Sequence, residues 1–203
     1  MLPDISLLTI VVLIVSVVIS LTIHEFTHGY VAHRLGDTTA SEGGRVSFNP
    51  LRHIDPLTTV LLPIATIVLF GIPFLAARPV PFNPARVKYE DYGAAMVAAA
   101  GPLSNLLLAF LGALVAQQYA AGLLYQILTI FVSLNVAILV FNLIPIPPLD
   151  GSRVLYAFAP DRVREFFDRI EPYGIFIVLG LVLLTGLSSV IGNIQHNIID
   201  FLL

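Results

Sequence analysis

The sequence contains no cysteine and few charged residues, and both absences restrict what this chain can be. Without cysteine, disulfide bonds, thiolate metal ligands and cysteine nucleophiles are excluded. Charged residues make up 11% of the 203 residues, well below the share of about 25% in soluble domains. The small net charge of −3 argues against a nucleic-acid partner. With 57% hydrophobic residues and a mean hydropathy of +0.92, the composition is that of an integral protein of a lipid bilayer.

Basic residues are also missing from the N-terminus, which lacks the A-x-A-like cleavage site of a signal peptide. We therefore expect the first apolar segment to remain in the protein. No internal repeat is present, and the longest polar interval is too short to fold as a soluble module. The sequence predicts one membrane-embedded domain over residues 1–203.

Five apolar segments are present, and the first is long enough to cross a bilayer. Its run from Ile5 to Ile23 has 19 residues without a charge, close to the roughly 20 that span a bilayer core. The second is interrupted by Pro63, Gly71 and Pro73. The pattern predicts an all-α membrane protein with four spanning helices and a re-entrant second segment, with five or six spans as the alternative. The segments are residues 5–35, 57–77, 94–116, 122–144 and 172–192.

The positive charges favour one topology. All ten Lys and Arg residues fall in three intervals, residues 34–52, 78–88 and 153–169. Because cytoplasmic loops of membrane proteins are rich in Lys and Arg, we expect all three intervals on the cytoplasmic side. This predicts a multi-pass protein of the cell membrane with its N-terminus outside. If the second segment spanned the membrane instead, the interval 78–88 would lie outside and the orientation of every later segment would be reversed.

The first apolar segment leads into the motif His24-Glu25-Phe26-Thr27-His28. On a helix, H-E-x-x-H places two imidazoles on one face, where both can bind one zinc ion, with the glutamate placed to act on water. Polar groups in a membrane helix are unfavourable unless they have partners. A shared metal therefore explains the motif better than a polar patch at the membrane surface. We expect one Zn²⁺ per chain, toward the cytoplasmic side.

Two histidines leave a catalytic zinc site incomplete, because such sites usually have three protein ligands. Asp150 is the candidate for the third. It follows the fourth apolar segment in a proline-broken stretch, 142–151, of the kind that lines a cavity. Asp150 could also cap the helix that begins at Ser152, and both roles can hold. To share a metal, Asp150 must lie on the same side of the membrane as His24 and His28, and it does so if the second segment is re-entrant. The shared metal and the distribution of positive charge therefore favour the same topology.

These motifs together resemble the site-2 proteases, the family of intramembrane zinc metalloproteases, in its compact form without a PDZ or nucleotide-sensing domain. The resemblance implies that His24, His28 and Asp150 bind zinc. It also implies that Glu25 is the general base and that Asn142 holds the substrate or the oxyanion. The matching elements are His24-Glu25-x-x-His28, Gly101-Pro102-x-x-Asn105, and Asn142-x-x-Pro145 leading to Leu149-Asp150-Gly151.

The resemblance further implies a metalloendopeptidase that hydrolyses a peptide bond in or near the transmembrane segment of a membrane protein. This reaction is called regulated intramembrane proteolysis. The substrate would be a single-pass membrane protein, such as an anti-sigma factor or a membrane-tethered regulator. A zinc-binding membrane transporter and a catalytically silent scaffold are the alternatives. The intact Glu25 and the absence of an inverted repeat favour the hydrolase.

Four features have roles that the sequence leaves open. Asn142 could bond between helices instead of binding substrate. Asn105 could line the site or join two helices, and we favour the structural role. We interpret His53 as a surface-loop histidine rather than an extra ligand. We expect a short membrane-associated loop or strand region after the first helix, in which the stretch 46–48 could form a short strand that pairs with an extended substrate.

Overall fold

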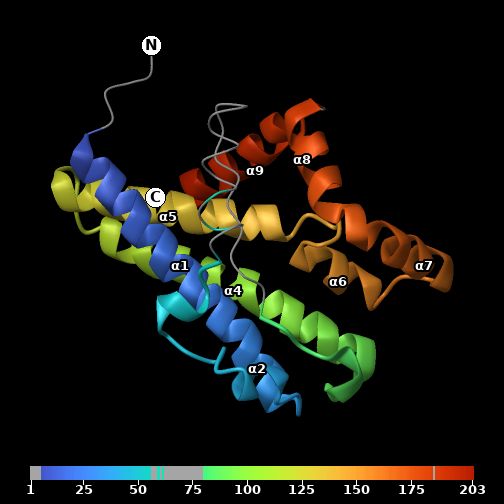
Figure 1. Cartoon of the computed structure of the whole chain (residues 1–203). Helices are drawn as coiled ribbons and strands as arrows, with labels where there is room; N and C mark the ends of the chain where they lie inside the picture. Colours follow the sequence, from blue (N-terminus) through green and yellow to red (C-terminus); the bar gives the residue numbers. More distant parts are fainter. Residues whose placement is uncertain (1–5, 56–58, 60, 62–79, 185) are drawn as a thin grey trace.

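The computed structural model describes residues 6–55, 59, 61, 80–184 and 186–203 (Figure 1). These residues form helices and no strand, which confirms the all-α prediction for this part of the chain. The α-helices are α1 (Leu7–Arg34), α2 (Thr39–Glu42), α4 (Glu90–Ala116), α5 (Leu123–Asn142), α6 (Asp150–Tyr156), α7 (Asp161–Ile170), α8 (Gly174–Leu184) and α9 (Leu187–Leu202). The short 3-10 helices are η1 (Pro50–Arg52), η3 (Pro84–Arg86) and η4 (Glu171–Tyr173).

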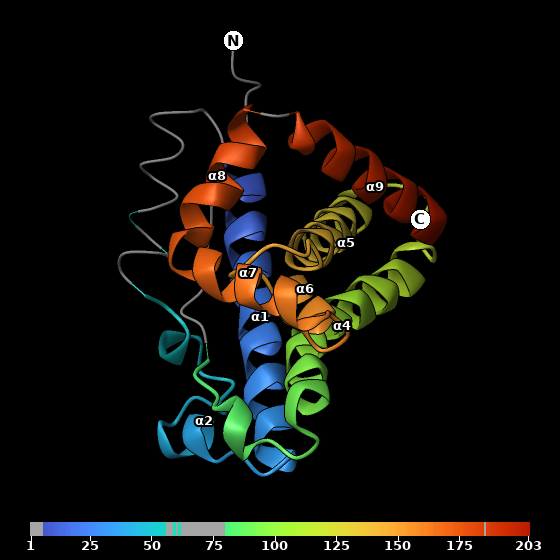
Figure 2. The same ribbon diagram turned by 90° about the vertical axis from the view of Figure 1, so that its right-hand side faces the viewer.

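In the described part of the chain, three helices, α1, α4 and α5, are long and apolar enough to cross a membrane, which makes this a multi-pass membrane protein. Helix α4 packs against both α1 and α5, as Figures 1 and 2 show from two sides. Small side chains such as Ala109 and Ala113 on α4 meet Val132 and Val136 on α5 in a buried cluster. Small residues let membrane helices approach closely, so the Ala- and Gly-rich third segment forms the centre of the bundle.

The fifth apolar segment, 172–192, which is predicted to span the membrane, is divided between two helices. Helix α8 ends at Leu184, and α9 begins at Leu187 after Gly186, whose φ of +64° is a left-handed conformation that suits glycine. The helical stretches Asp161–Val182 and Leu187–Leu202 are bent by 81° relative to each other (Figure 2). Within the described residues, a fourth crossing is present if this bent pair acts as one span. The re-entrant segment predicted over 57–77 lies largely outside the described residues.

The strand expected at 46–48 is wrong. The backbone bends there, and Phe48 folds back so that its ring stacks on Phe26 of α1 with centroids 3.9 Å apart. The region between α1 and η1 is therefore a loop with one short helix, α2. The loop part of the prediction is confirmed, whereas an edge for strand pairing is not present at these three residues.

The three basic intervals meet at one end of the bundle. The backbone N–H of Lys88 donates to the carbonyl of Leu35 at 2.9 Å, which places the start of α4 beside the end of α1. The guanidinium of Arg164 on α7 pairs with the carboxylate of Asp91 on α4 at 2.7 Å. Residues from 34–52, 78–88 and 153–169 are thereby held near one another, as a shared location on one side of the membrane requires.

Asp37 anchors the segment that leads into α4. Its buried carboxylate accepts hydrogen bonds from Thr39, both backbone and hydroxyl, and from the backbone N–H of Asn83 at 2.6 Å. Burial alone would raise the pKa of Asp37, but these hydrogen bonds outweigh it and hold the pKa below its ordinary value. The anchor is therefore a carboxylate at neutral pH.

Candidate metal centre

Helix α1 carries His24 and His28 one turn apart, with both side chains buried. Their rings meet edge to face, with centroids 4.6 Å apart and the two Nε2 atoms 3.0 Å apart. This is the arrangement that the four-residue spacing predicts. Helix α4 approaches these rings closely, and they fit because the residue there is Gly101, at which a Cβ would lie 2.3 Å from His28 Nε2. The conformation of the pair thus depends on a glycine of a different helix.

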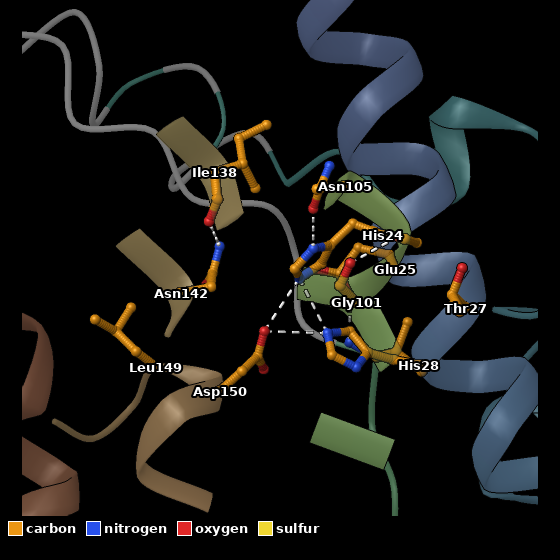
Figure 3. Close-up of polar contacts among 12 residues, drawn as sticks. His24, Glu25, Thr27, His28, Gly101, Asn105, Ile138, Asn142, Leu149 and Asp150 are labelled. Carbon is orange, nitrogen blue, oxygen red and sulfur yellow. Dashed lines mark hydrogen bonds and ion pairs between the residues drawn. The ribbon is translucent and has the colours of Figure 1, made fainter. Parts of the chain in front are cut away.

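Asp150, the first residue of α6, completes the cluster (Figure 3). Its Oδ2 lies 3.2 Å from His24 Nε2 and 3.3 Å from His28 Nε2. The three atoms therefore form a nearly equilateral triangle. Tetrahedral zinc with bonds of about 2.0–2.1 Å holds its ligand atoms roughly 3.3 Å apart. The size of the triangle and its set of two imidazoles and one carboxylate both fit zinc.

The hydrogen bonds behind the imidazoles turn their lone pairs into this triangle. His28 Nδ1 lies 2.7 Å from the carbonyl oxygen of Val97, which can only accept, so Nδ1 carries the hydrogen and Nε2 is free. His24 Nδ1 lies 2.6 Å from Asn105 Oδ1. Asp150 Oδ2 is buried and accepts no hydrogen bond from the described residues. Three electron-pair donors that face one another this closely favour a cation between them.

Glu25 lies beside this triangle and is held by a backbone donor. Its side chain is buried, and its Oε2 accepts a hydrogen bond from the N–H of Val80 at 3.0 Å. Because Pro79 and Pro81 have no N–H, Val80 is the one residue of this tripeptide that can donate. The extended segment that begins at Val80 thus contacts α1 next to the candidate metal site.

A cavity of about 440 Å³ contains these groups, a size typical of ligand sites. Asn142 lies in its wall, where the side-chain amide donates to the carbonyl of Ile138 at 3.0 Å (Figure 3). At another part of the wall, the Arg153 guanidinium pairs with Glu171 at 2.7 Å and lies 5.5 Å from the centroid of the Phe82 ring. The chain therefore brings all five residues singled out in its sequence, His24, Glu25, His28, Asn142 and Asp150, to one cavity.

The structure also places Asn105 and His53, whose roles the sequence leaves open. Asn105 joins α4 to α1 through a hydrogen bond with His24. It therefore links two helices, as we favoured, and at the same time contacts a candidate metal ligand. His53 is buried rather than on the surface, and its Nε2 donates to the carbonyl of Ser47 at 2.8 Å. It is not part of the cluster of possible metal ligands found among the described residues.

Sequence reasoning missed Val80 and Asn135, which has 0% exposure and contacts Asn105. The two prolines around Val80 and the asparagine inside an apolar segment were the available signals. A buried polar residue in a membrane helix is expected to have a functional partner. The identity of that partner, however, depends on how α4 and α5 pack.

Comparison with known proteins gives the family. The model of peptidase family M50 matches residues 113–185. The chain is 38% identical to "Putative zinc metalloprotease YwhC" of Bacillus subtilis over 187 residues, which cover 87% of this chain and 82% of that protein. It is 30% identical to "Putative zinc metalloprotease MJ0611" of Methanocaldococcus jannaschii over 75% of this chain and 73% of that protein.

A third relative, "Putative zinc metalloprotease Rip2" of Mycolicibacterium smegmatis, is 29% identical over 90% of this chain and 70% of that protein. No significant match was found among solved structures. The similarity agrees with the resemblance seen in the motifs. The chain belongs to peptidase family M50.

Proposed function

We propose that this chain is an intramembrane zinc metalloprotease that hydrolyses a peptide bond in or near the transmembrane segment of a membrane protein. The observation that carries the proposal is the triangle of His24 Nε2, His28 Nε2 and Asp150 Oδ2 beside a buried carboxylate, Glu25. This set lies in a cavity between apolar helices, so the reaction takes place at membrane depth. The whole chain, 1–203, acts as one membrane-embedded domain.

Each residue has a chemical task. His24, His28 and Asp150 hold the one zinc ion, which when bound supplies Lewis-acid activation of water and of the scissile carbonyl. Glu25 takes a proton from the attacking water and passes it to the leaving amine. The Val80 N–H holds Oε2 of Glu25, which leaves Oε1 to receive the proton. The Asn142 amide exchanges its bond to Ile138 for one to the substrate oxyanion.

The proposed topology places the N-terminus outside and the basic intervals on the cytoplasmic side. The hydrogen bonds and ion pair that hold these intervals together support it. A reporter fused near Asn83 is expected to read as cytoplasmic. A reading on the outer side would contradict the topology.

The substrate proposed here is a single-pass membrane protein, of the class of anti-sigma factors and membrane-tethered regulators. The proposal follows from the position of the site, because a cavity lined in part by the apolar helices α1, α4 and α5 suits a chain that is itself in the membrane. The family implies membrane protein substrates in general. Cleavage would release the cytoplasmic part of such a regulator.

The test is cleavage of a tagged single-span substrate by purified protein in detergent, with zinc content measured in parallel. Wild type should cleave within the membrane segment, whereas Glu25→Gln should bind zinc equally and not cleave. Glu165→Gln is the matched control, because this glutamate is exposed on α7, where it pairs with Arg169 at the surface. This variant should cleave like wild type. Equal cleavage by Glu25→Gln and wild type would reject the role of Glu25. Zinc binding without cleavage of any substrate in a panel would favour the silent scaffold.

A further inference from the structure

A line of buried amides runs from His24 across three helices. Asn105 on α4 and Asn135 on α5 both have 0% exposure. Asn105 lies 2.6 Å from His24 Nδ1, Asn105 Nδ2 donates to Asn135 Oδ1 at 2.9 Å, and Asn135 Nδ2 donates to the carbonyl of Phe131 at 2.9 Å. Two fully buried asparagines inside apolar helices are unfavourable unless every group is satisfied, and here they are satisfied by one another.

The direction of these hydrogen bonds is fixed at the far end of the line. A backbone carbonyl can only accept, so Phe131 requires Asn135 to turn its NH₂ group toward it. The oxygen of Asn135 then faces Asn105, which must present its own NH₂ group, and the oxygen of Asn105 in turn faces His24. His24 must therefore carry its hydrogen on Nδ1.

This direction matters because only one tautomer of neutral histidine can bind a metal through Nε2. With the hydrogen on Nδ1, the Nε2 lone pair faces His28 and Asp150. If Asn105 flipped, its NH₂ group would donate to Nδ1 and the hydrogen would move to Nε2, where it would block a metal. The carbonyl of Ser20 also faces Asn105 Nδ2, but at 3.5 Å, and gives a weaker bias against the flip.

We infer that Asn135 is a positioning residue that sets, through the amide of Asn105, the metal-binding tautomer of His24. The inference rests on the proposed role of His24 as a metal ligand. Asn135 does not line the cavity, and its side-chain hydrogen bonds join it to Asn105 and Phe131 rather than to the candidate ligands. Its effect is to determine that Asn105 turns its side-chain oxygen, and not its NH₂ group, toward His24.

Two substitutions of similar size separate this role from simple packing. Asn135→Leu removes the acceptor for the NH₂ group of Asn105. Asn135→Asp keeps this acceptor, because a neutral aspartic acid accepts from Asn105 through its carbonyl oxygen and donates to the carbonyl of Phe131 through its hydroxyl. A residue that only fills space between α4 and α5 would tolerate Leu better than Asp, since burying an ionisable group is the more unfavourable change. A residue that sets the direction of hydrogen bonds gives the opposite order.

The experiment measures zinc affinity of the full chain in detergent by competition with a chromogenic chelator, without any substrate. Asn135→Leu should weaken zinc binding by about 10- to 100-fold, the usual effect of losing an outer partner of a metal ligand, and Asn135→Asp should remain close to wild type. The nitrogen NMR spectrum of histidine-labelled, metal-free protein should show His24 protonated on Nδ1 in wild type and Asn135→Asp. In Asn135→Leu this tautomer should be lost.

Two control variants on α5 account for helix damage. Val132→Ala and Val136→Ala each remove packing at a fully buried position on the same helix as Asn135. Both should keep zinc affinity near that of wild type even where the melting temperature falls. Zinc loss in Val136→Ala equal to that in Asn135→Leu would overturn the inference in favour of packing.

The inference and the proposed function can fail separately. If wild type binds no zinc, or His24→Ala binds it as tightly as wild type, the metal site itself is refuted. If zinc binding depends on His24 but Asn135→Leu retains the affinity of wild type, only the inference is overturned. A weaker zinc affinity in Asn135→Asp than in Asn135→Leu would overturn it too.

Discussion

Replacing Gly101 with alanine tests whether the close approach of α4 shapes the metal site. The added Cβ would lie 2.3 Å from His28 Nε2, 2.6 Å from His28 Cε1 and 2.7 Å from His24 Cε1. Ordinary van der Waals contact begins at 3.4 Å, so the methyl group must be separated from the nearest ring atom by roughly 1 Å more. It would point at both rings at once.

Neither ring can turn away freely. The hydrogen bonds of His28 Nδ1 to Val97 and of His24 Nδ1 to Asn105 hold both rings from behind. If α4 moves instead, overpacking of this kind is expected to destabilise the fold by about 1–3 kcal/mol. If the rings move, a displacement of about 1 Å at a catalytic centre lowers the rate by about 100-fold. The triangle of 3.0–3.3 Å then no longer fits zinc.

The assay compares zinc affinity, cleavage rate and melting temperature in Gly101→Ala and in a matched variant of the same helix, Gly112→Ala. A Cβ at Gly112 would meet Val132 Cγ2 at 3.1 Å, a tight contact with an apolar side chain away from the cavity. We expect Gly112→Ala to bind zinc like wild type and Gly101→Ala to lose affinity and cleavage together. A folded Gly101→Ala protein with the zinc affinity and rate of wild type would refute the reasoning.

Two further predictions concern the segment that contacts α1 and its anchor. Val80→Pro removes the N–H that holds Glu25 and should lower the cleavage rate by about tenfold or more with zinc retained. Val80→Ala keeps the N–H and should cleave faster than Val80→Pro. Equal rates in the two variants would contradict the role of the Val80 N–H as a donor to Glu25. Because the folded-state pKa of Asp37 is lowered, its carboxylate stabilises the fold above about pH 4 and this contribution disappears as the pH falls through the folded-state pKa. Asp37→Asn should therefore melt at a lower temperature at pH 7, with a cost of about 1–3 kcal/mol, and its difference from wild type should shrink on acidification; a constant difference would argue against this.

The sequence predicts well what depends on spacing within one segment. The apolar lengths predict α1, α4 and α5, and the four-residue spacing predicts the shared face of His24 and His28. Asp150 was identified because a carboxylate directly after an apolar segment has few roles there other than capping a helix or binding a metal. Its Oδ2 indeed lies between the two histidines.

What the sequence could not predict depends on contacts between distant segments. The clash that excludes a side chain at residue 101 involves residue 28, the donor to Glu25 comes from Val80, and the partner of Asn105 is Asn135. No periodicity within one segment contains these pairs. The bend at Gly186 was missed for a different reason, because an isolated glycine in an apolar run is usually tolerated within a helix.

The position of the candidate site along α1 determines from which end water can reach it. At 1.5 Å per residue, the helix rises about 26 Å from Leu7 to His24 but only about 9 Å from His28 to Arg34. The longer part exposes apolar side chains such as Leu7 and Ile14, as contact with lipid requires. The Arg34 end is also where the basic intervals meet. Water therefore has its shorter path to the candidate metal centre from this polar end of α1.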